Sequence, residues 1–254
     1  TLASEASASA ISPSPRALNI LSQFVYNQMV YAYNREMNWS PDLSYVVGLI
    51  TTDGNLSKDG RHITFVSKDI DQINNFIRIL NLDCKICTKK GSYSNTKLYY
   101  YIQFSNVILY RFLLSIGLMP NKTKIIRELA IPNEYFADFL RGHLDGDGYT
   151  YSHWDKRWTS SFRLYTIFMS ASLIHLQWIR MKILEIYGIS GKLNYYGRSV
   201  YYLVFAKVKS SLLLRFLYYN KDVTCLKRKL FKIESALGII SKQAGVEKLV
   251  YSLP

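Results

Sequence analysis

Two nine-residue stretches, VVGLITTDG at residues 46–54 and LRGHLDGDG at residues 140–148, are the most informative part of this sequence. Each has a glycine at its third position, Gly48 or Gly142, and ends in Asp-Gly. Apolar spacing predicts that both stretches close a helix. A glycine inside a helix costs about 1 kcal/mol relative to alanine, and an acid at a helix C-terminus opposes the helix dipole. We therefore expect both features to serve something other than helix stability.

The acids of the two stretches, Asp53 and Asp147, would lie side by side if the two glycines let the helices touch. Two carboxylates about 4 Å apart repel each other by roughly 4 kcal/mol at an effective dielectric of 20. Divalent cations such as Mg²⁺ prefer carboxylate, water and phosphate oxygens, and they would remove this repulsion. Metal ions held in this way support phosphodiester hydrolysis. One Asp-Gly would be interpreted as a plain helix stop, but two in matching positions favour a function.

The rest of the sequence repeats around these stretches. The order helix-strand-strand-helix-strand-strand-helix is predicted twice. YYIQF at 100–104 matches YYLVF at 201–205, LYRFL at 109–113 matches LLRFL at 213–217, and a basic segment follows each third helix. We predict an α+β fold of two pseudo-symmetric αββαββα repeats, like a fused twofold dimer. The predicted domains are an N-terminal extension with a helix (1–39), a first repeat (40–130) and a second repeat (131–254).

Composition favours a polyanionic partner. The 254 residues include 32 Lys and Arg against 18 Asp and Glu, which gives a net charge of +14. Phosphates attract such a surface and release counterions on binding, so nucleic acid is the expected partner. The three cysteines are too few for a disulfide framework or a four-cysteine zinc site. No apolar run reaches the roughly 18–20 residues of a membrane span, so we expect no membrane partner.

The two Asp-Gly stretches and the repeat order resemble the LAGLIDADG homing endonucleases, over about residues 40–235. The segments NKTK at 121–124 and IPNEYF at 131–136 resemble intron-encoded members of bacterial or organellar type. The resemblance implies a monomer in which two antiparallel sheets form a DNA-binding saddle, with the motif helices at the interface. It also implies cleavage of both strands of a long double-stranded DNA site. An intracellular location follows, in a bacterial cytoplasm or an organelle matrix.

The resemblance also implies residue roles. Asp53 and Asp147 would bind two or three shared Mg²⁺ ions, with Thr52 and Gly146 offering backbone carbonyls. Mn²⁺ would substitute, and Ca²⁺ would support binding without cleavage. Lysines near the scissile phosphates would be Lys68, Lys122 and Lys227, with Lys124 and Lys229 as neighbours. Ala171 stands where the second repeat would match Lys68, so the two active sites are expected to be unequal.

DNA contacts are expected on the sheets, because two-stranded ribbons fit the major groove. Alternation along the strands, with Ile102, Phe104, Leu203 and Phe205 facing inward, leaves the other side chains for DNA. The expected contacts are Asn55, Ser57, Lys85, Lys89, Lys97, Tyr101, Gln103, Tyr149, Tyr151, His153, Arg163, Lys192, Arg198 and Tyr202.

Three alternatives remain open at this point. An RNA maturase of the same fold would bind its host intron RNA and assist splicing, and it could keep both acids. A non-catalytic DNA-binding regulator would be favoured by loss of an acid, but Asp53 and Asp147 are both present. A basic structural or ribosomal protein would have no need of two carboxylates at one place.

Overall fold

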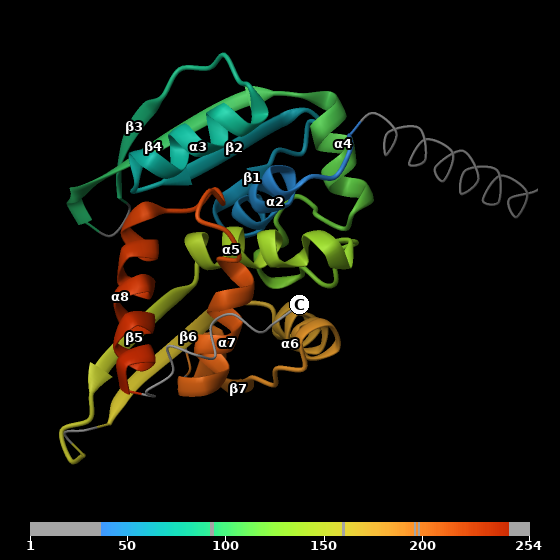
Figure 1. The fold of residues 1–254 in the computed structure, drawn as a ribbon. Coiled ribbons are helices and arrows are strands. Elements are labelled where there is room, and N and C mark those ends of the chain that lie inside the picture. Colours follow the sequence, from blue (N-terminus) through green and yellow to red (C-terminus); the bar gives the residue numbers. More distant parts are fainter. Residues whose placement is uncertain (1–36, 92–93, 159–160, 196, 198, 244–254) are drawn as a thin grey trace, which may run out of the picture. The chain divides into compact units, whose positions relative to one another are not determined.

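A computed structural model describes residues 37–91, 94–158, 161–195, 197 and 199–243 (Figure 1). The predicted helix at 16–38 falls outside these residues except for its last two positions, and so does Arg198. The description below concerns the unit that begins at Trp39. Within the described residues, no helix has the length and apolar character needed to cross a membrane.

The described chain contains the same series of elements twice. The first series is α2 (Pro41–Asp53), β1 (Gly54–Leu56), β2 (His62–Ser67), α3 (Ile70–Leu80), β3 (Cys87–Gly91), β4 (Ser94–Ser105) and α4 (Val107–Ser115). The second is α5 (Phe136–Gly146), β5 (Tyr149–Trp154), β6 (Phe162–Ser170), α6 (Leu173–Tyr187), β7 (Lys192–Tyr195), β8 (Tyr201–Ala206) and α7 (Lys207–Leu217). Short 3₁₀ turns at Lys122–Lys124 and Asn133–Tyr135 join them.

The two sheets have the same topology. Their strand orders are β1-β2-β4-β3 and β5-β6-β8-β7, and all neighbouring strands are antiparallel. The predicted α+β fold with two αββαββα repeats is therefore confirmed.

Two local predictions differ from the structure. The basic segment at 225–232 continues into a long helix, α8 (Lys227–Gln243), which the repeat pattern did not predict. Lys85 was assigned to a strand, but β3 begins only at Cys87, so Lys85 lies in the loop after α3. The left-handed C-cap at Asn81 ends α3 and starts this loop.

One face of each sheet packs against helices to form a core. In the first repeat, Phe65 of β2 stacks on Phe76 of α3, with ring centroids 4.4 Å apart. In the second repeat, Phe168 of β6 meets Phe205 of β8 edge to face, at 6.2 Å. The inward side chains predicted for β4 and β8 are buried as expected: Ile102, Phe104, Leu203 and Phe205. This packing leaves the opposite face of each sheet for other partners.

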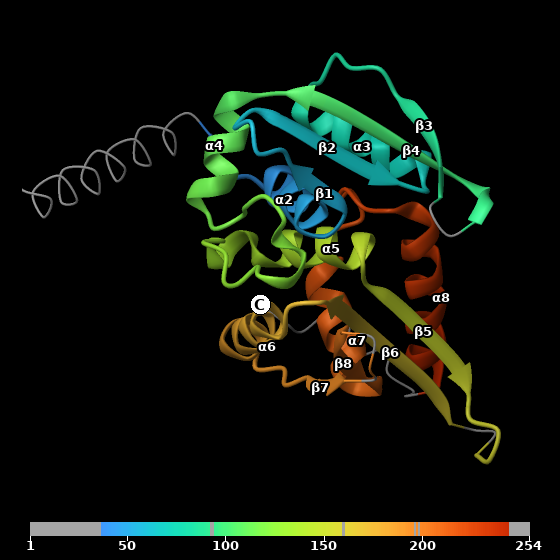
Figure 2. The ribbon, with the colours of Figure 1, turned by 180° about the vertical axis from the view of Figure 1, so that it is seen from behind.

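Helices α2 and α5 lie side by side between the two sheets, as both views show (Figures 1 and 2). Ser40 caps α2 by accepting a hydrogen bond from the Leu43 amide at 3.1 Å, and Pro41 occupies the first turn. Nine of the thirteen residues of α2 are buried, because α5 covers one side and the first repeat covers the others. The ends of α2 and α5 therefore meet at the centre of this unit.

Candidate active site

Close helix contact brings the two Asp-Gly motifs together. A methyl group added at Gly48 would overlap the Phe139 carbonyl oxygen and lie 2.7 Å from the His143 amide nitrogen. One added at Gly142 would overlap the Tyr45 carbonyl oxygen and lie 3.0 Å from its carbonyl carbon. Both obstacles are backbone atoms, so only glycine permits this crossing.

Asp53 and Asp147 stand at the ends of these crossing helices. Asp53 is the last residue of α2, and Asp147 directly follows α5. Burial and, to a smaller extent, the negative charge of Asp147 raise the pKa of Asp53 to about 7, against the effect of nearby lysines. Burial also raises the pKa of Asp147, against the effect of Lys122 and Lys229. The two carboxylates therefore share one electrostatic environment, although they are 94 positions apart in the sequence.

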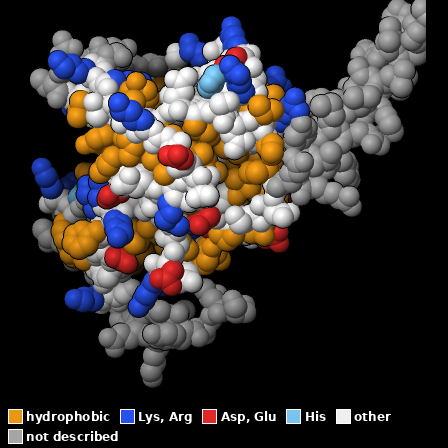
Figure 3. All heavy atoms as spheres, turned by 90° about the horizontal axis from the view of Figure 1, so that it is seen from above, with side chains coloured by type: hydrophobic (Ala, Val, Ile, Leu, Met, Phe, Trp, Pro, Cys, Tyr) orange, Lys and Arg blue, Asp and Glu red, His pale blue; other side chains and the backbone are white. Residues whose placement is uncertain are grey.

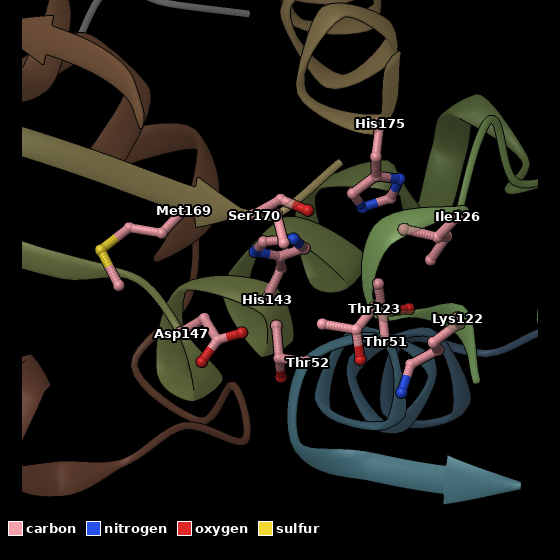
Figure 4. Close-up of a pocket in the computed structure, with 11 residues that line it drawn as sticks. Thr51, Thr52, Lys122, Thr123, Ile126, His143, Asp147, Met169, Ser170 and His175 are labelled. Carbon is pink, nitrogen blue, oxygen red and sulfur yellow. The ribbon is translucent and has the colours of Figure 1, made fainter. Parts of the chain in front are cut away.

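The acids face two hollows of different size. The larger, which we call the Asp53 hollow, has a volume of about 280 Å³ and is lined by Asp53, Lys68, Gln72, Gly146, Arg228 and Lys229, among others. The smaller, the Asp147 chamber, has a volume of about 50 Å³ and includes Thr51, Thr52, Lys122, Asp147, Ala171 and His175 (Figure 4).

Each hollow is lined by the acid of one motif and by the residue that directly precedes the acid of the other motif. Gly146 lines the Asp53 hollow, and Thr52 lines the Asp147 chamber. A methyl group at Gly146 would lie 2.9 Å from Asp53 Oδ2, which shows how closely this backbone approaches the opposite acid. Both hollows therefore combine a carboxylate of one repeat with a residue of the other repeat.

Two buried lysines donate hydrogen bonds to main-chain carbonyls at the ends of the two motifs. The Lys122 ammonium group donates to the Gly54 carbonyl. The Lys229 ammonium group donates to the carbonyls of Leu144, Asp145 and Gly148, at 2.6, 2.8 and 2.7 Å. Gly54 and Gly148 are matching residues of the two motifs, so Lys122 and Lys229 are structural equivalents. Burial lowers the pKa of each lysine to about 8.

Lys227 was predicted as the partner of Lys122, and the structure corrects that assignment. Lys227 is exposed at the start of α8, whereas Lys229 is buried beneath the second motif. The residue that matches Lys122 therefore lies two positions later than the sequence predicts. In α8, successive positions point in different directions, so the side chain two residues later is the one that turns inward.

The remaining lysine predictions concern the ends of β2 and β6. Lys68 follows β2 and lines the Asp53 hollow, where its charge lowers the pKa of Asp53. Ala171 follows β6 and lines the Asp147 chamber. The two hollows are therefore chemically different, with a lysine at this position in only one of them.

The fold was compared with known structures. The LAGLIDADG meganuclease I-AabMI bound to uncleaved DNA matches with a TM-score of 0.56 and 16% identity, over 81% of this chain and 92% of that one. The homing endonuclease I-WcaI bound to its DNA recognition sequence matches with a TM-score of 0.53 and 12% identity, over 80% and 91%. The described chain has the two-repeat LAGLIDADG fold. No protein-family model and no curated protein matches the sequence.

The LAGLIDADG fold also occurs outside these nucleases. Full-length DUF199/WhiA from Thermatoga maritima matches with a TM-score of 0.52 and 17% identity, over 82% of this chain. This chain spans 62% of that protein's length. Identities this low establish the fold, and activity has to be argued from the site itself.

The LAGLIDADG motif ends offer ligands that suit a divalent cation. No group of three His, Cys, Asp or Glu able to hold a metal occurs within the described ranges. The available set is instead two carboxylates and the main chain at Thr52 and Gly146, which are hard oxygen donors of the kind Mg²⁺ prefers. Mg²⁺ keeps several waters and commonly takes phosphate oxygens as further ligands. Burial and, after it, the charge of Asp147 raise the pKa of Asp53, and a bound cation would offset both by favouring the ionised carboxylate. The residues present therefore fit the metal that the fold implies.

The predicted DNA contacts fall largely on the sheet faces that turn away from the core. In the first sheet, Asn55 pairs with Thr64 and Thr64 with Gln103, while Tyr101 pairs with Val66, so these side chains share one face. The Lys89 ammonium lies 5.7 Å from the ring centroid of Tyr101. Lys97 has the same strand parity as Tyr101. Ser57 lies just beyond β1, where its carbonyl accepts from Tyr110.

The second sheet presents an aromatic face. Tyr151 is paired with Tyr165 and His153 with Arg163, and these residues lie opposite the core side chains. The rings of Tyr151, His153 and Tyr165 stack with centroids 4.9 to 6.4 Å apart. The same face includes Tyr149, Lys192 and Tyr202.

Two charged residues within the second motif, Arg141 and Asp145, received no role in the expected active site from the sequence. Asp145 is buried and accepts hydrogen bonds from the Tyr45 hydroxyl at 2.9 Å and the Leu226 amide at 2.7 Å. Arg141 is buried and forms an ion pair with Asp138 at 2.5 Å, while donating to the carbonyls of Leu217 and Thr224 at 2.8 Å. Both fasten the motif helices to the chain that precedes α8. Asp145 lies two residues before Asp147 in the motif, but no sequence pattern predicts that either charge is buried.

Proposed function

We propose that this protein is a divalent-metal-dependent DNA endonuclease that cuts both strands of one long site. The observation that carries this proposal is the meeting of Asp53 and Asp147 at the ends of two glycine-bearing helices, each beside a hollow. The crossing and the buried acids reduce stability, which makes a purely structural role a poor explanation. The resemblance to DNA-bound structures of the same fold supports the choice of substrate.

The acids and the lysines of the site would have different roles in the proposed cleavage. Asp53 and Asp147 would hold Mg²⁺, which when bound supplies charge stabilisation and a reactive water. Lys122 and Lys229 fix the carbonyls at the motif ends and offset the negative charge of the acids. Lys68 adds positive charge at the rim of the Asp53 hollow, where it would face a phosphate. The outer sheet faces would supply the DNA contacts.

The DNA partner accounts for the charge of the chain. Lys and Arg side chains are spread over the face seen in Figure 3, with acidic side chains between them. Because one chain carries both acids, we propose that it acts as a monomer. We also propose an intron-encoded origin and an intracellular location, with Mn²⁺ able to replace Mg²⁺.

The test is cleavage of duplex DNA that carries the intron insertion region. We expect double-strand cleavage with Mg²⁺ or Mn²⁺, and binding without cleavage with Ca²⁺. Asp53→Asn and Asp147→Asn should each abolish cleavage and leave binding nearly unchanged. Asp222→Asn, the same change at an exposed loop acid, should cut like the native chain.

Two results would contradict the nuclease proposal. Unimpaired double-strand cleavage by Asp147→Asn would remove this acid from the active site. Tight, metal-independent binding with no cleavage of any duplex would favour a binding protein on the same fold. Preferential binding of the host intron RNA in that case would favour a maturase.

A further inference from the structure

The Asp147 chamber contains two histidines that the proposed chemistry does not yet use. His143 comes from α5 and His175 from α6, and each is 1% exposed. Their rings stack with centroids 5.5 Å apart and an interplanar angle of 22°. Figure 4 shows both beside the chamber, with Lys122, Thr51 and Asp147 around them. They therefore form part of its wall.

One ring nitrogen of His175, Nε2, is a hydrogen-bond acceptor that has no donor among the described residues. Its Nδ1 lies 2.7 Å from the Arg127 carbonyl oxygen, and a carbonyl only accepts, so Nδ1 must carry the proton. Nε2 is then an unprotonated acceptor, and burial keeps the ring neutral by lowering its pKa to about 4. Nε2 is buried without a protein partner among the described residues. Leaving such an atom unpaired costs about 1–3 kcal/mol, so a water molecule is its expected partner.

The chamber has room for that water. A cavity needs roughly 10–15 Å³ to hold one water molecule. The chamber, at about 50 Å³, accommodates a few waters and is too small for an organic ligand. Its wall also includes Thr51, Lys122 and Asp147, so waters inside it would have polar partners from His175 to the acid.

The first repeat has a counterpart of His175 in the same place. Gln72 is the third residue after the N-cap of α3, as His175 is after the N-cap of α6. Gln72 lines the Asp53 hollow and is 2% exposed. Its Oε1 accepts from the Ser67 hydroxyl at 2.6 Å, and its Nε2 has no partner in the part of the chain that the structure describes. Both hollows thus have a buried polar side chain with an unpaired nitrogen at matching positions, and His143 adds a second such nitrogen, its Nδ1, to the wall of the Asp147 chamber.

We propose that Gln72 and His175 are positioning residues that each hold the water chain from which one strand of the DNA is attacked. This inference rests on the proposed nuclease function. In each hollow a water oxygen forms a bond to phosphorus while the bond from phosphorus to the leaving oxygen breaks. The attacking water releases one proton into the chain of waters, and the leaving oxygen takes one up. The side chain accepts or donates a hydrogen bond throughout and keeps its own protons.

The proposal predicts that the two positions act on different strands. A duplex with a different fluorophore on each strand, cut under single-turnover conditions, gives a rate for each strand. His175→Leu should slow one strand about tenfold, the equivalent of one lost hydrogen bond of about 1.4 kcal/mol. Gln72→Leu should slow the other strand by a similar factor. His175→Gln should restore the rate, because the chain itself uses glutamine at the matching position.

Two further measurements separate positioning from structural damage. DNA affinity in Ca²⁺ and the melting temperature should stay near native values in His175→Gln and Gln72→His, which keep a polar atom. A high-resolution crystal structure should show a water within about 3.2 Å of His175 Nε2. Equal slowing of both strands by each leucine variant, no rescue by His175→Gln, or a dry chamber would overturn the proposal.

The outcome also distinguishes this inference from the proposed function. If the native chain cuts both strands and the leucine variants do too at native rates, the positioning role fails and the nuclease stands. If the native chain cuts no DNA, the nuclease proposal fails, and the positioning role fails with it.

Discussion

At the residue scale, Lys122 and Lys229 show how a site can depend on buried side chains that hold its main chain in place. Each donates to the carbonyl of the glycine that ends a motif, and Lys229 also serves two carbonyls of the last turn of α5. They satisfy acceptors that a helix C-terminus leaves open. They also place positive charge near Asp53 and Asp147. The same groups therefore stabilise the motif ends and moderate the charge of the site.

We expect Lys229→Met to lower the free energy of unfolding by about 2–3 kcal/mol, because it leaves three carbonyls without a donor. Lys227→Met, the same change at an exposed position two residues earlier, should alter it by about 0.5 kcal/mol or less. Urea unfolding of the three proteins measures both values. A larger loss for Lys227→Met than for Lys229→Met would show that the basic segment is placed wrongly.

The raised pKa of Asp53 makes stability depend on pH. Its carboxyl has a pKa of about 7 in the folded chain against 3.8 in the reference state. Folding therefore opposes ionisation, and the metal-free protein loses stability from this group as pH rises from about 4 to 7. Asp53→Asn removes the effect, so it should raise the free energy of unfolding by about 2 kcal/mol near pH 8, after allowance for solvent screening.

The gain from Asp53→Asn should shrink toward zero as pH falls below about 4, where the Asp53 carboxyl becomes protonated in the unfolded as well as the folded chain. Denaturant titrations with a chelator, near pH 5 and pH 8, measure this trend. Adding Ca²⁺ near pH 8 should stabilise the native chain more than the variant. A gain that grows as pH falls would show that the carboxyl is not held in this environment.

At the scale of elements, the crossing of α2 and α5 governs the site. The helices approach closely enough that main-chain atoms of Phe139, His143 and Tyr45 occupy the space where a methyl group would stand at Gly48 or Gly142. Small residues permit such an approach, and larger ones force the helices apart. Separation of the helices would also separate Asp53 from Asp147.

We expect Gly142→Ala to reduce the free energy of unfolding by about 3 kcal/mol and to abolish cleavage, because the backbone must move to admit the methyl group. Gly238→Ala is the matched control, since Gly238 lies in α8 with no atom within 4 Å of the added methyl. That change should stabilise the chain by about 0.5–1 kcal/mol, the usual gain within a helix. Thermal unfolding measures the stability of both variants, and a cleavage assay measures their activity. A neutral Gly142→Ala would refute the close crossing.

At the scale of the whole molecule, the net charge of +14 should dominate association with DNA. Binding that neutralises phosphates releases counterions, so affinity falls steeply with salt. If about 6–10 phosphates are contacted, we expect affinity for the target to drop roughly 10³- to 10⁵-fold between about 50 and 200 mM salt. Fluorescence anisotropy in Ca²⁺ at several salt concentrations gives the slope. A nearly flat dependence would be inconsistent with DNA bound along the sheets.

The substitution Lys89→Ala tests whether a single lysine on the sheet contributes to the salt dependence of DNA affinity. Lys89 is exposed on β3, on the face predicted to contact DNA. Loss of one phosphate contact should lower the magnitude of the slope by about 1. Lys242→Ala, at the end of α8, should leave it unchanged.

The sequence by itself determined the repeat, the fold class and the two acids. Hydrophobic periodicity depends on local geometry, and a glycine or acid at an unfavourable helix position is visible without coordinates. The same information placed the inward faces of β4 and β8. These features could be predicted because each depends on neighbours within one element or on a pattern that occurs twice in the sequence.

Only the tertiary structure decided which side chains complete the hollows. Lys229 rather than Lys227 turns beneath the second motif, and Gln72 and His175 line their hollows from the helices that follow the two motifs, α3 and α6. Burial of Arg141 and Asp145 likewise depends on the chain that leads into α8. Direction and burial of a polar side chain are set by packing between elements, and a sequence pattern describes one element at a time.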